Sequence, residues 1–266
     1  MQEEFLGSAD IMVDGHQPLT DSQWQVIAPL LPVQRKRRLC LRQVVDAVRY
    51  ICRTGCQWRS LPASFPAWTA VYYYFRRWQQ QRLWQQVNQA LNQADRLAAN
   101  RAPMPSLVCL DSQSVKLAPR IFEHRGTDGG KRVNGRKRQI VTDVDGRIFA
   151  CRVHAANGHD GTQALHLLPT RPNWGQRLTT VVTDKGYRGR FATHLQTLGL
   201  VHQLGSRPPS DRGFVPVAKR WVVERTFAWL VCFRRLAVDY DFTPASHETW
   251  LLVANSTMCL NRLCPN

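Results

Sequence analysis

Hydrophobic residues recur at helical spacing through the first hundred positions of the chain. The pattern predicts a helix that is capped at Thr20 or Asp21 and that Pro32 ends. A second helix is predicted from Leu41 to Thr54, and Gly55 supplies its C-terminal cap. The chain therefore begins with an all-α region.

Two further helices follow in this region. One begins after Thr69 and places Arg76 and Arg77 among several aromatic residues, and the other runs from about Leu83 to Ala99. Helices joined by short turns, the third of them rich in Tyr and Arg, are typical of a helix-turn-helix that docks into a DNA groove. An ordinary helical bundle with aromatic packing is the alternative that this stretch leaves open.

The pattern changes from helices to strands after Ser106. The apolar run Leu107–Leu110 is typical of a strand buried on both faces, and we expect Asp111 at its carboxyl end. The stretch Thr179–Asp184 has the same design and also ends in an aspartate. If these strands are adjacent and parallel, their two carboxylates lie side by side, which is costly unless a cation lies between them.

The remaining elements extend this sheet. Asp145-Gly146 between two alternating runs predicts a hairpin turn, and the element order becomes β-β-β-α-β-α-β-α. This order predicts an α/β domain with a mixed sheet flanked by helices. Pro103 and Pro105 mark its boundary. The expected division is a flexible tail, a helical DNA-binding domain and a catalytic domain, over residues 1–18, 19–102 and 103–266.

Charge narrows the class of partner. The chain has 36 Lys and Arg against 19 Asp and Glu, a formal net charge of +17. Such a protein usually meets a polyanion, with nucleic acid the first expectation and an anionic membrane surface a rival. No apolar stretch is long enough for a membrane span, and the acidic start is unlike a signal peptide. We therefore expect a cytoplasmic protein with no membrane partner and, since its eight Cys form no CxxC, reduced thiols.

A third carboxylate joins the two strand-end aspartates. Glu224 lies on a helix predicted from Lys219 to Leu230, among apolar neighbours, although a surface ion pair with Arg220 is the ordinary interpretation. Together with Asp111 and Asp184 it supplies hard oxygen ligands, which suit Mg²⁺ or Mn²⁺. Two such ions can activate an attacking oxygen and stabilise the leaving one in phosphodiester displacement.

Basic residues near these carboxylates are candidate phosphate contacts. The stretch Lys116–Arg138 is rich in Gly, Lys and Arg and has no P-loop pattern. The residues that we expect to contact DNA are Arg76, Arg77, Lys137, Arg138, Arg188 and Arg220.

Several sequence blocks resemble the insertion-sequence-five family of bacterial transposases. They are LTDSQWQVIAPLLP, RTGCQWRSLP, LDSQSVK, NGRKRQIVTD, TDKGYRG and RWVVERTFAWL, and the likeness covers roughly Leu19 to Leu263. The resemblance implies a ribonuclease H-like core behind the helical region, and places the family's catalytic acids on Asp111, Asp184 and Glu224. Two positions depart from the family pattern: Val217 stands where a Tyr is common, and Val231 where a basic residue is common.

The resemblance also implies an activity. A DDE transposase of this kind binds the terminal inverted repeats of an insertion sequence in double-stranded DNA, cleaves them with two Mg²⁺ or Mn²⁺ ions, and transfers the 3′ ends to target DNA. At least a dimer is expected on DNA, and the protein is expected to associate with the bacterial nucleoid. Two alternatives stay open: a nuclease without strand transfer, and a transposase-derived DNA-binding protein.

Overall fold

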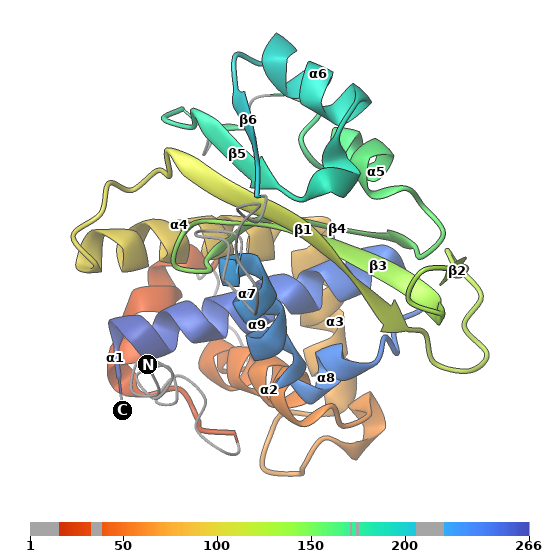
Figure 1. Cartoon of the computed structure of the whole chain (residues 1–266). Coiled ribbons are helices and arrows are strands. Elements are labelled where there is room, and N and C mark those ends of the chain that lie inside the picture. The colour runs from red at the N-terminus through yellow and green to blue at the C-terminus, as the bar shows by residue number, and fades with distance from the viewer. Residues whose placement is uncertain (1–15, 33–38, 171, 174–175, 206–220, 266) are drawn as a thin grey trace, which may run out of the picture. The chain divides into compact units, whose positions relative to one another are not determined.

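The chain is described as a computed structural model over residues 16–32, 39–170, 172–173, 176–205 and 221–265 (Figure 1). It divides into two compact units. The helical unit consists of Met1–Arg101, Trp229–Ala237 and Thr249–Asn266, and the sheet unit of Ala102–Ala228 and Val238–Glu248. The first segment of the helical unit ends at Arg101, next to the expected domain limit at residue 102, and two C-terminal segments group with the helical unit. Most of the predicted tail lies outside the described residues.

Local signals set the first two helices of the helical unit. Helix α1 (Asp21–Ile27) begins with a capping box, in which Thr20 and Gln23 each bond the other's backbone N–H, and it passes into a short 3-10 turn, η2 (Ala28–Leu30). Helix α2 (Leu41–Thr54) has the predicted bounds and ends at Gly55, whose φ of 69° is readily adopted by glycine.

The rest of the helical unit packs around aromatic residues. Its elements are η3 (Trp58–Ser60), α3 (Trp68–Gln80), α4 (Leu83–Ala98), α8 (Arg234–Ala237) and α9 (Pro244–Leu263) from Thr249 onward. The ring of Phe75 on α3 stacks on that of Trp250 on α9, with centroids 4.4 Å apart. The C-terminal helix therefore completes the core of the helical unit, which the sequence patterns did not predict.

A network of buried amides joins α4 to α9. The side-chain nitrogen of Asn255 donates to the amide oxygens of Asn88 and Asn92, at 2.6 and 2.9 Å. These three side chains are at most 2% exposed. Close by on the same two helices, Arg262 donates to the carboxylate of Asp95 at 2.7 Å. Polar groups thus align α9 with α4 inside an otherwise apolar core.

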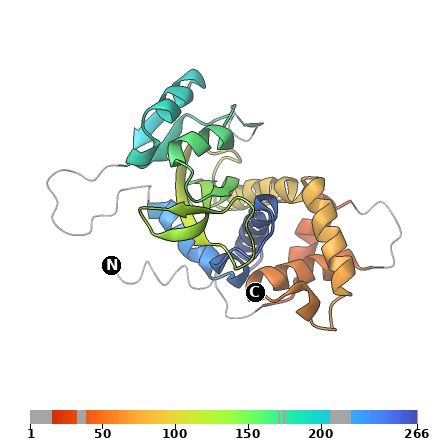
Figure 2. The same ribbon diagram turned by 90° about the vertical axis from the view of Figure 1, so that its right-hand side faces the viewer.

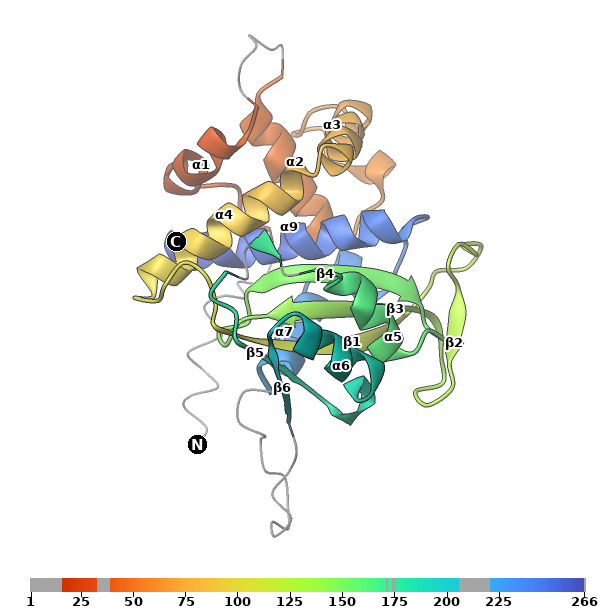
Figure 3. The same cartoon turned by 90° about the horizontal axis from the view of Figure 1, so that it is seen from above.

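The sheet unit is built on one mixed sheet, whose strand order Figure 3 shows. A short strand and a long one both pair with β3 on the side away from β1, and two parallel strands follow on the other side of β1. The strands are β1 (Leu107–Lys116), β2 (Gly126–Asp128), β3 (Val133–Thr142), β4 (Ile148–Ala155), β5 (Thr180–Thr183) and β6 (Val201–Leu204). The predicted hairpin, which joins β3 to β4, and the predicted order of the main elements are confirmed.

Strand β1 is longer than its apolar run indicates. It continues to Lys116, so Asp111 lies in the middle of the strand and not at its end. The cause is the neighbouring β3, which pairs with β1 from Cys109 to Lys116, whereas β5 pairs only as far as Cys109. The prediction that β1 ends at Asp111 is therefore wrong. Asp111 nevertheless lies just beyond the point where the parallel pairing of β1 with β5 ends.

Helices cover both faces of this sheet (Figure 1). Helices α5 (Asp160–Leu167) and α6 (Arg190–Thr197) lie next to each other (Figure 2) and pack on one face through the core around Leu110, Val181 and Phe191. Helix α7 (Trp221–Val231) lies against the other face. Among the described helices, none is long and apolar enough to cross a membrane.

Candidate active site

The two predicted aspartates come from neighbouring parallel strands. Leu107 pairs with Thr180 and Cys109 with Val182, so continuing this register by two residues sets Asp111 opposite Asp184. Adjacent strands are about 4.8 Å apart. The long-range pairing of β1 with β5 thus brings together two carboxylates that are far apart in the sequence.

Backbone amides orient both carboxylates. The N–H of Ser112 donates to one oxygen of Asp111 at 2.7 Å, and the N–H of Gly186 donates to one oxygen of Asp184 at 2.8 Å. Asp184 is the N-cap of a 3-10 turn, η5 (Lys185–Tyr187). Hydrogen bonds of this kind hold a carboxylate in one orientation.

Tyr187 is a buried tyrosine whose pKa responds to the two aspartates. Its side chain is buried, and its hydroxyl accepts a hydrogen bond from the amide of Gln139 at 3.3 Å. Burial raises the pKa of Tyr187 well above its usual value, and the charges of Asp111, Asp160 and Asp184 raise it further. The phenol therefore stays protonated at neutral pH. Sequence reasoning missed Tyr187, although it lies in the TDKGYRG block.

Asp160 also belongs to this neighbourhood. Asp160 is the first residue of helix α5, whose N-cap is His159. Its carboxylate lies 3.1 Å from the ammonium of Lys137. Its negative charge also adds to the rise in the pKa of Tyr187 that burial causes.

Glu224 lies on the helix that faces Asp111. In the register of β1 and β3, Asp111 and Gln113 point to the same face as Ile140 and Arg138. Phe227 of α7 lies on this face, because the guanidinium of Arg138 is 5.8 Å from the centre of its ring. Glu224, which is exposed, is three residues before Phe227 and so on the same side of the helix.

The ligand atoms of Asp111, Asp184 and Glu224 do not all lie within metal-binding distance of one another. Among the described residues, one group of three His, Cys, Asp or Glu side chains has ligand atoms within 4.8 Å of one another, and it consists of Asp239, Asp241 and His247. Asp111, Asp184 and Glu224 therefore share a region of the sheet unit without meeting at that distance.

Two predicted phosphate contacts have partners inside the protein. Arg138 is fully buried and hydrogen-bonds the amide oxygen of Gln113, and burial lowers its pKa to about 10. The ammonium of Lys137 lies between the carboxylates of Asp128 and Asp160, at 3.8 and 3.1 Å. Both side chains support the sheet in this structure, and Arg138 has no exposed surface to offer a phosphate.

The other predicted contacts differ in exposure. Arg77 and Arg188 are exposed and Arg76 is partly exposed, while Arg220, like Val217, lies outside the described residues. Val231, which departs from the family pattern, is 44% exposed.

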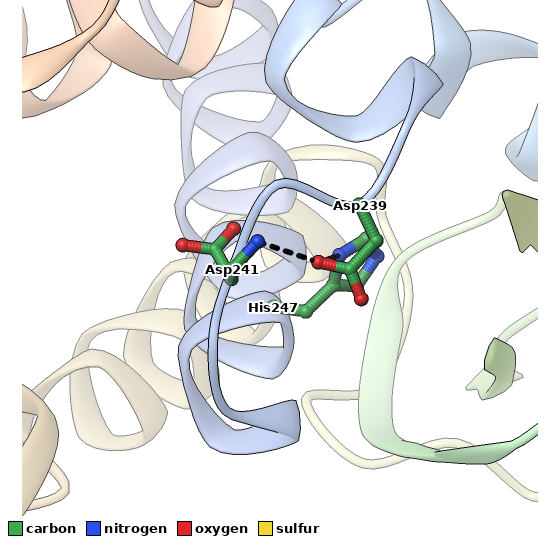
Figure 4. Close-up of side chains that lie close together, drawn as sticks. All are labelled: Asp239, Asp241 and His247. Atoms are coloured by element: carbon green, nitrogen blue, oxygen red, sulfur yellow. Dashed lines mark hydrogen bonds and ion pairs between the residues drawn. The ribbon is translucent and has the colours of Figure 1, made fainter. Parts of the chain in front are cut away.

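The group Asp239, Asp241 and His247 is shown in Figure 4. Asp239 and His247 are fully buried, and the Nδ1 atom of His247 lies 3.1 Å from one carboxylate oxygen of Asp239. The other oxygen accepts from Arg136 at 2.9 Å. Burial raises the pKa of Asp239, but His247, the Asp241 N–H and Arg136 outweigh it and bring the pKa to about 2. Arg136 therefore supplies the positive charge that a metal ion would bring, and we assign this group a structural role.

Comparisons with known proteins agree with this architecture. Residues 102–261 match the family described as "Transposase DDE domain", and residues 19–88 match the family described as "Putative transposase of IS4/5 family". The chain belongs to the DDE transposases of the IS4/5 family. The match to the DDE domain covers the whole sheet unit and most of the two C-terminal segments of the helical unit, and the predicted family is confirmed.

Two curated relatives come from Burkholderia cepacia. The chain is 35% identical over 137 residues to a protein named as the putative transposase for insertion sequence element IS402, which covers 48% of the chain and 64% of that relative. It is 28% identical over 112 residues to the IS402 uncharacterized 16.2 kDa protein, covering 37% of the chain and 72% of that relative. The chain thus matches less than two thirds of the first relative. No solved structure matches it.

Proposed function

We propose that this chain cuts the ends of an insertion sequence and joins them to target DNA, with Asp111, Asp184 and Glu224 as its catalytic acids. The observation that supports the proposal is the parallel β1–β5 register, which pairs Cys109 with Val182, two residues before each aspartate. Glu224 lies on α7. The contact of Phe227 on this helix with Arg138 of β3 shows that α7 covers the sheet face to which Asp111 belongs.

The donor set fits a hard divalent cation. Two neighbouring carboxylates disfavour each other's charge, and a cation between them removes that cost. Burial raises the pKa of Tyr187, and the charges of these two carboxylates and of Asp160 raise it further. Oxygen donors of this kind suit Mg²⁺ or Mn²⁺, here two ions. When bound, such ions activate an attacking oxygen and stabilise the leaving one.

The chain's own residues prepare the acids for this task. Gly186 and Ser112 hold the carboxylates of Asp184 and Asp111 through their backbone N–H groups. Tyr187, kept protonated, adds no negative charge beside them and can donate a hydrogen bond. The exposed Lys185 and Arg188 follow Asp184 directly, where they can contact the phosphates of a bound strand.

The helical unit binds the terminal inverted repeats. Arg76 and Arg77 lie on α3, and the hydroxyl of Tyr73 accepts from Arg77 at 3.2 Å on the exposed face of that helix. We assign α3 to the element's ends in a helix-turn-helix-like docking. Two ends must be joined in one event, so a dimer or larger assembly forms on double-stranded DNA, in association with the nucleoid.

The test compares DNA cleavage and joining by the wild type and by Asp184→Ala. The substrate is a labelled DNA that carries the element's own ends, with Mg²⁺ in the buffer. The matched control is Asp21→Asn, because the side chain of Asp21 is 85% exposed and lies far from Asp184 in the sequence. We expect joined products from the wild type and the control, and none from Asp184→Ala.

Three other results would change the conclusion. Cut but unjoined ends, even when pre-cut ends are supplied, would favour a nuclease. Specific binding without any chemistry in all three proteins would favour a transposase-derived DNA-binding protein. Equal joining by Asp184→Ala would remove Asp184 from the catalytic acids.

A further inference from the structure

Two loops of the sheet unit expose aromatic rings. Phe122, in the loop after β1, is 74% exposed, and Tyr240 and Phe242, between α8 and α9, are 51% and 66% exposed. We call these three residues the aromatic platform. Single exposed apolar residues are ordinary, but a group of large rings on one surface is typical of a binding site.

Arg136 holds the two loops side by side. Its Nη2 atom donates to the backbone oxygens of Glu123 and Phe242, at 2.5 and 2.8 Å. Its Nη1 atom donates to the Asp239 carboxylate and to the Asp241 carbonyl, at 2.9 and 2.8 Å. Because one buried guanidinium bonds both loops, the backbone segments that carry the exposed rings lie next to each other.

Backbone hydrogen bonds reinforce this arrangement. Asp239 donates its N–H to the carbonyl of Lys116 at 2.9 Å and accepts from the N–H of Ala118 at 2.9 Å. The segment that carries Tyr240 and Phe242 is thus bonded to the chain at the end of β1, directly before the loop of Phe122.

A second arginine fixes the loop of Phe122. Arg125 donates to the carbonyls of Ile121 and Ala118, each at 2.9 Å, and its guanidinium lies 5.6 Å from the centre of the Phe122 ring. This contact is within the range of a cation–π interaction. A ring that is held in place before binding loses little conformational entropy when a ligand stacks on it.

The charge around the platform selects the ligand. Four exposed cations come from β1 and the loops beside it: Lys116, Arg120, Lys131 and Arg132. A second copy of this chain would bring another net charge of +17 to this surface and be repelled. Nucleic acid has the opposite charge, and aromatic rings among cations are the usual platform for unpaired bases.

The platform lies within reach of DNA at the proposed active site. Asp111 and Lys116 are five residues apart on β1. At about 3.3 Å for each residue, the separation is about 17 Å, or roughly five nucleotide steps of 3.4 Å. We propose that unpaired bases of the DNA substrate, a few nucleotides from the position of cleavage, stack on Phe122 and Phe242. This inference rests on the proposed function, which supplies DNA as the substrate and the region of Asp111 as the position of cleavage.

The test measures binding of two DNA molecules by fluorescence anisotropy without divalent metal. One is a blunt duplex of arbitrary sequence, and the other is the same duplex with a single-stranded extension of about six nucleotides. The proteins are the wild type, the double variant Phe122→Ala/Phe242→Ala, and Leu97→Ala as control, since Leu97 is 57% exposed in the helical unit.

We expect the double variant to lose about 5- to 100-fold in affinity for the extended DNA and less than about twofold for the blunt duplex. The control should match the wild type on both. As a second measurement, 2-aminopurine in the extension should lose fluorescence when the wild type binds, and keep it with the double variant.

Other outcomes would overturn the proposal. An equal loss on both DNA molecules would mean that the rings do not stack on unpaired bases, and unchanged affinity would exclude DNA from the platform. Unchanged affinity with loss of self-association in sedimentation would identify a second copy as the occupant. Failure of the Asp184 test with preference for extended DNA intact would reject the transposase chemistry but not the platform.

Discussion

Each unit contains a buried polar cluster, and the two clusters differ in charge. In the helical unit, Asn255 joins Asn88 and Asn92 through neutral amides. In the sheet unit, Arg136 meets Asp239, which also contacts His247, so the buried groups carry charge. Amides keep the same state across the physiological pH range, whereas charged groups depend on their partners and on pH. The amide network and the Arg136–Asp239 pair should therefore respond differently to loss of one partner and to acid.

Arg136→Ala should give the largest effect. It leaves the Asp239 carboxylate buried without its cation and removes the hydrogen bonds to both loops of the aromatic platform. Removing one partner of a buried pair typically costs about 3–5 kcal/mol. We expect the free energy of unfolding to fall by this amount, with hydrogen exchange accelerated in the sheet unit.

Lys116→Ala is the matched control for that variant, because Lys116 is exposed at the end of β1, close to the same loops. Its free energy of unfolding should change by less than about 0.5 kcal/mol. If Arg136→Ala loses no more stability than this control, the buried charges do not support the sheet unit.

Asn255→Ala should give the next largest effect, in the helical unit. Two buried acceptors, on Asn88 and Asn92, lose their shared donor at once. A buried group left without its partner costs about 1–3 kcal/mol, so we expect a loss of roughly 3 kcal/mol in urea denaturation. The control is Thr257→Ala on the same helix, since the hydroxyl of Thr257 donates to the Val253 carbonyl within that helix. Equal loss in both variants would argue against the amide network.

Acid should have the smallest of the three effects on the free energy of unfolding. The pKa of Asp239 is about 2 in the folded protein and 3.8 as its ordinary value, so its charged form stabilises the fold. This contribution is complete above about pH 4 and is lost as the pH falls through 2, and the difference corresponds to about 2 kcal/mol.

The measurement is unfolding free energy against pH for the wild type and for Asp239→Asn. The variant should lack this part of the acid dependence. If the two proteins lose stability in parallel between pH 4 and pH 2, Asp239 is not the titrating group. The amide network of the helical unit should contribute no such dependence.

Sequence patterns predicted the helical unit well where signals are local. The bounds of α2 follow from its apolar spacing and from Gly55, and α1 begins at the predicted cap. The patterns gave no reason to group the end of α9 with this unit. That grouping depends on contacts such as Trp250 with Phe75, between residues far apart in the chain.

In the sheet unit, the sequence predicted the two strands that lead to Asp111 and Asp184 but not the length of β1. Those strands follow from two apolar runs, whereas the continuation of β1 to Lys116 follows from pairing with β3. The same pairing places Arg138 beside Gln113 in the interior. A list of basic residues cannot distinguish such an arginine from one that faces solvent.

The sequence by itself therefore determined the family, the start of α1, the bounds of α2 and the apolar runs of β1 and β5, because each depends on residue types at short fixed spacing. The tertiary structure decided which charges are exposed, where the C-terminal helix packs, and that Arg136 joins two loops with exposed rings. These properties depend on contacts between distant segments. Burial can turn the same side chain from a ligand contact into an internal partner, and no local pattern carries that information.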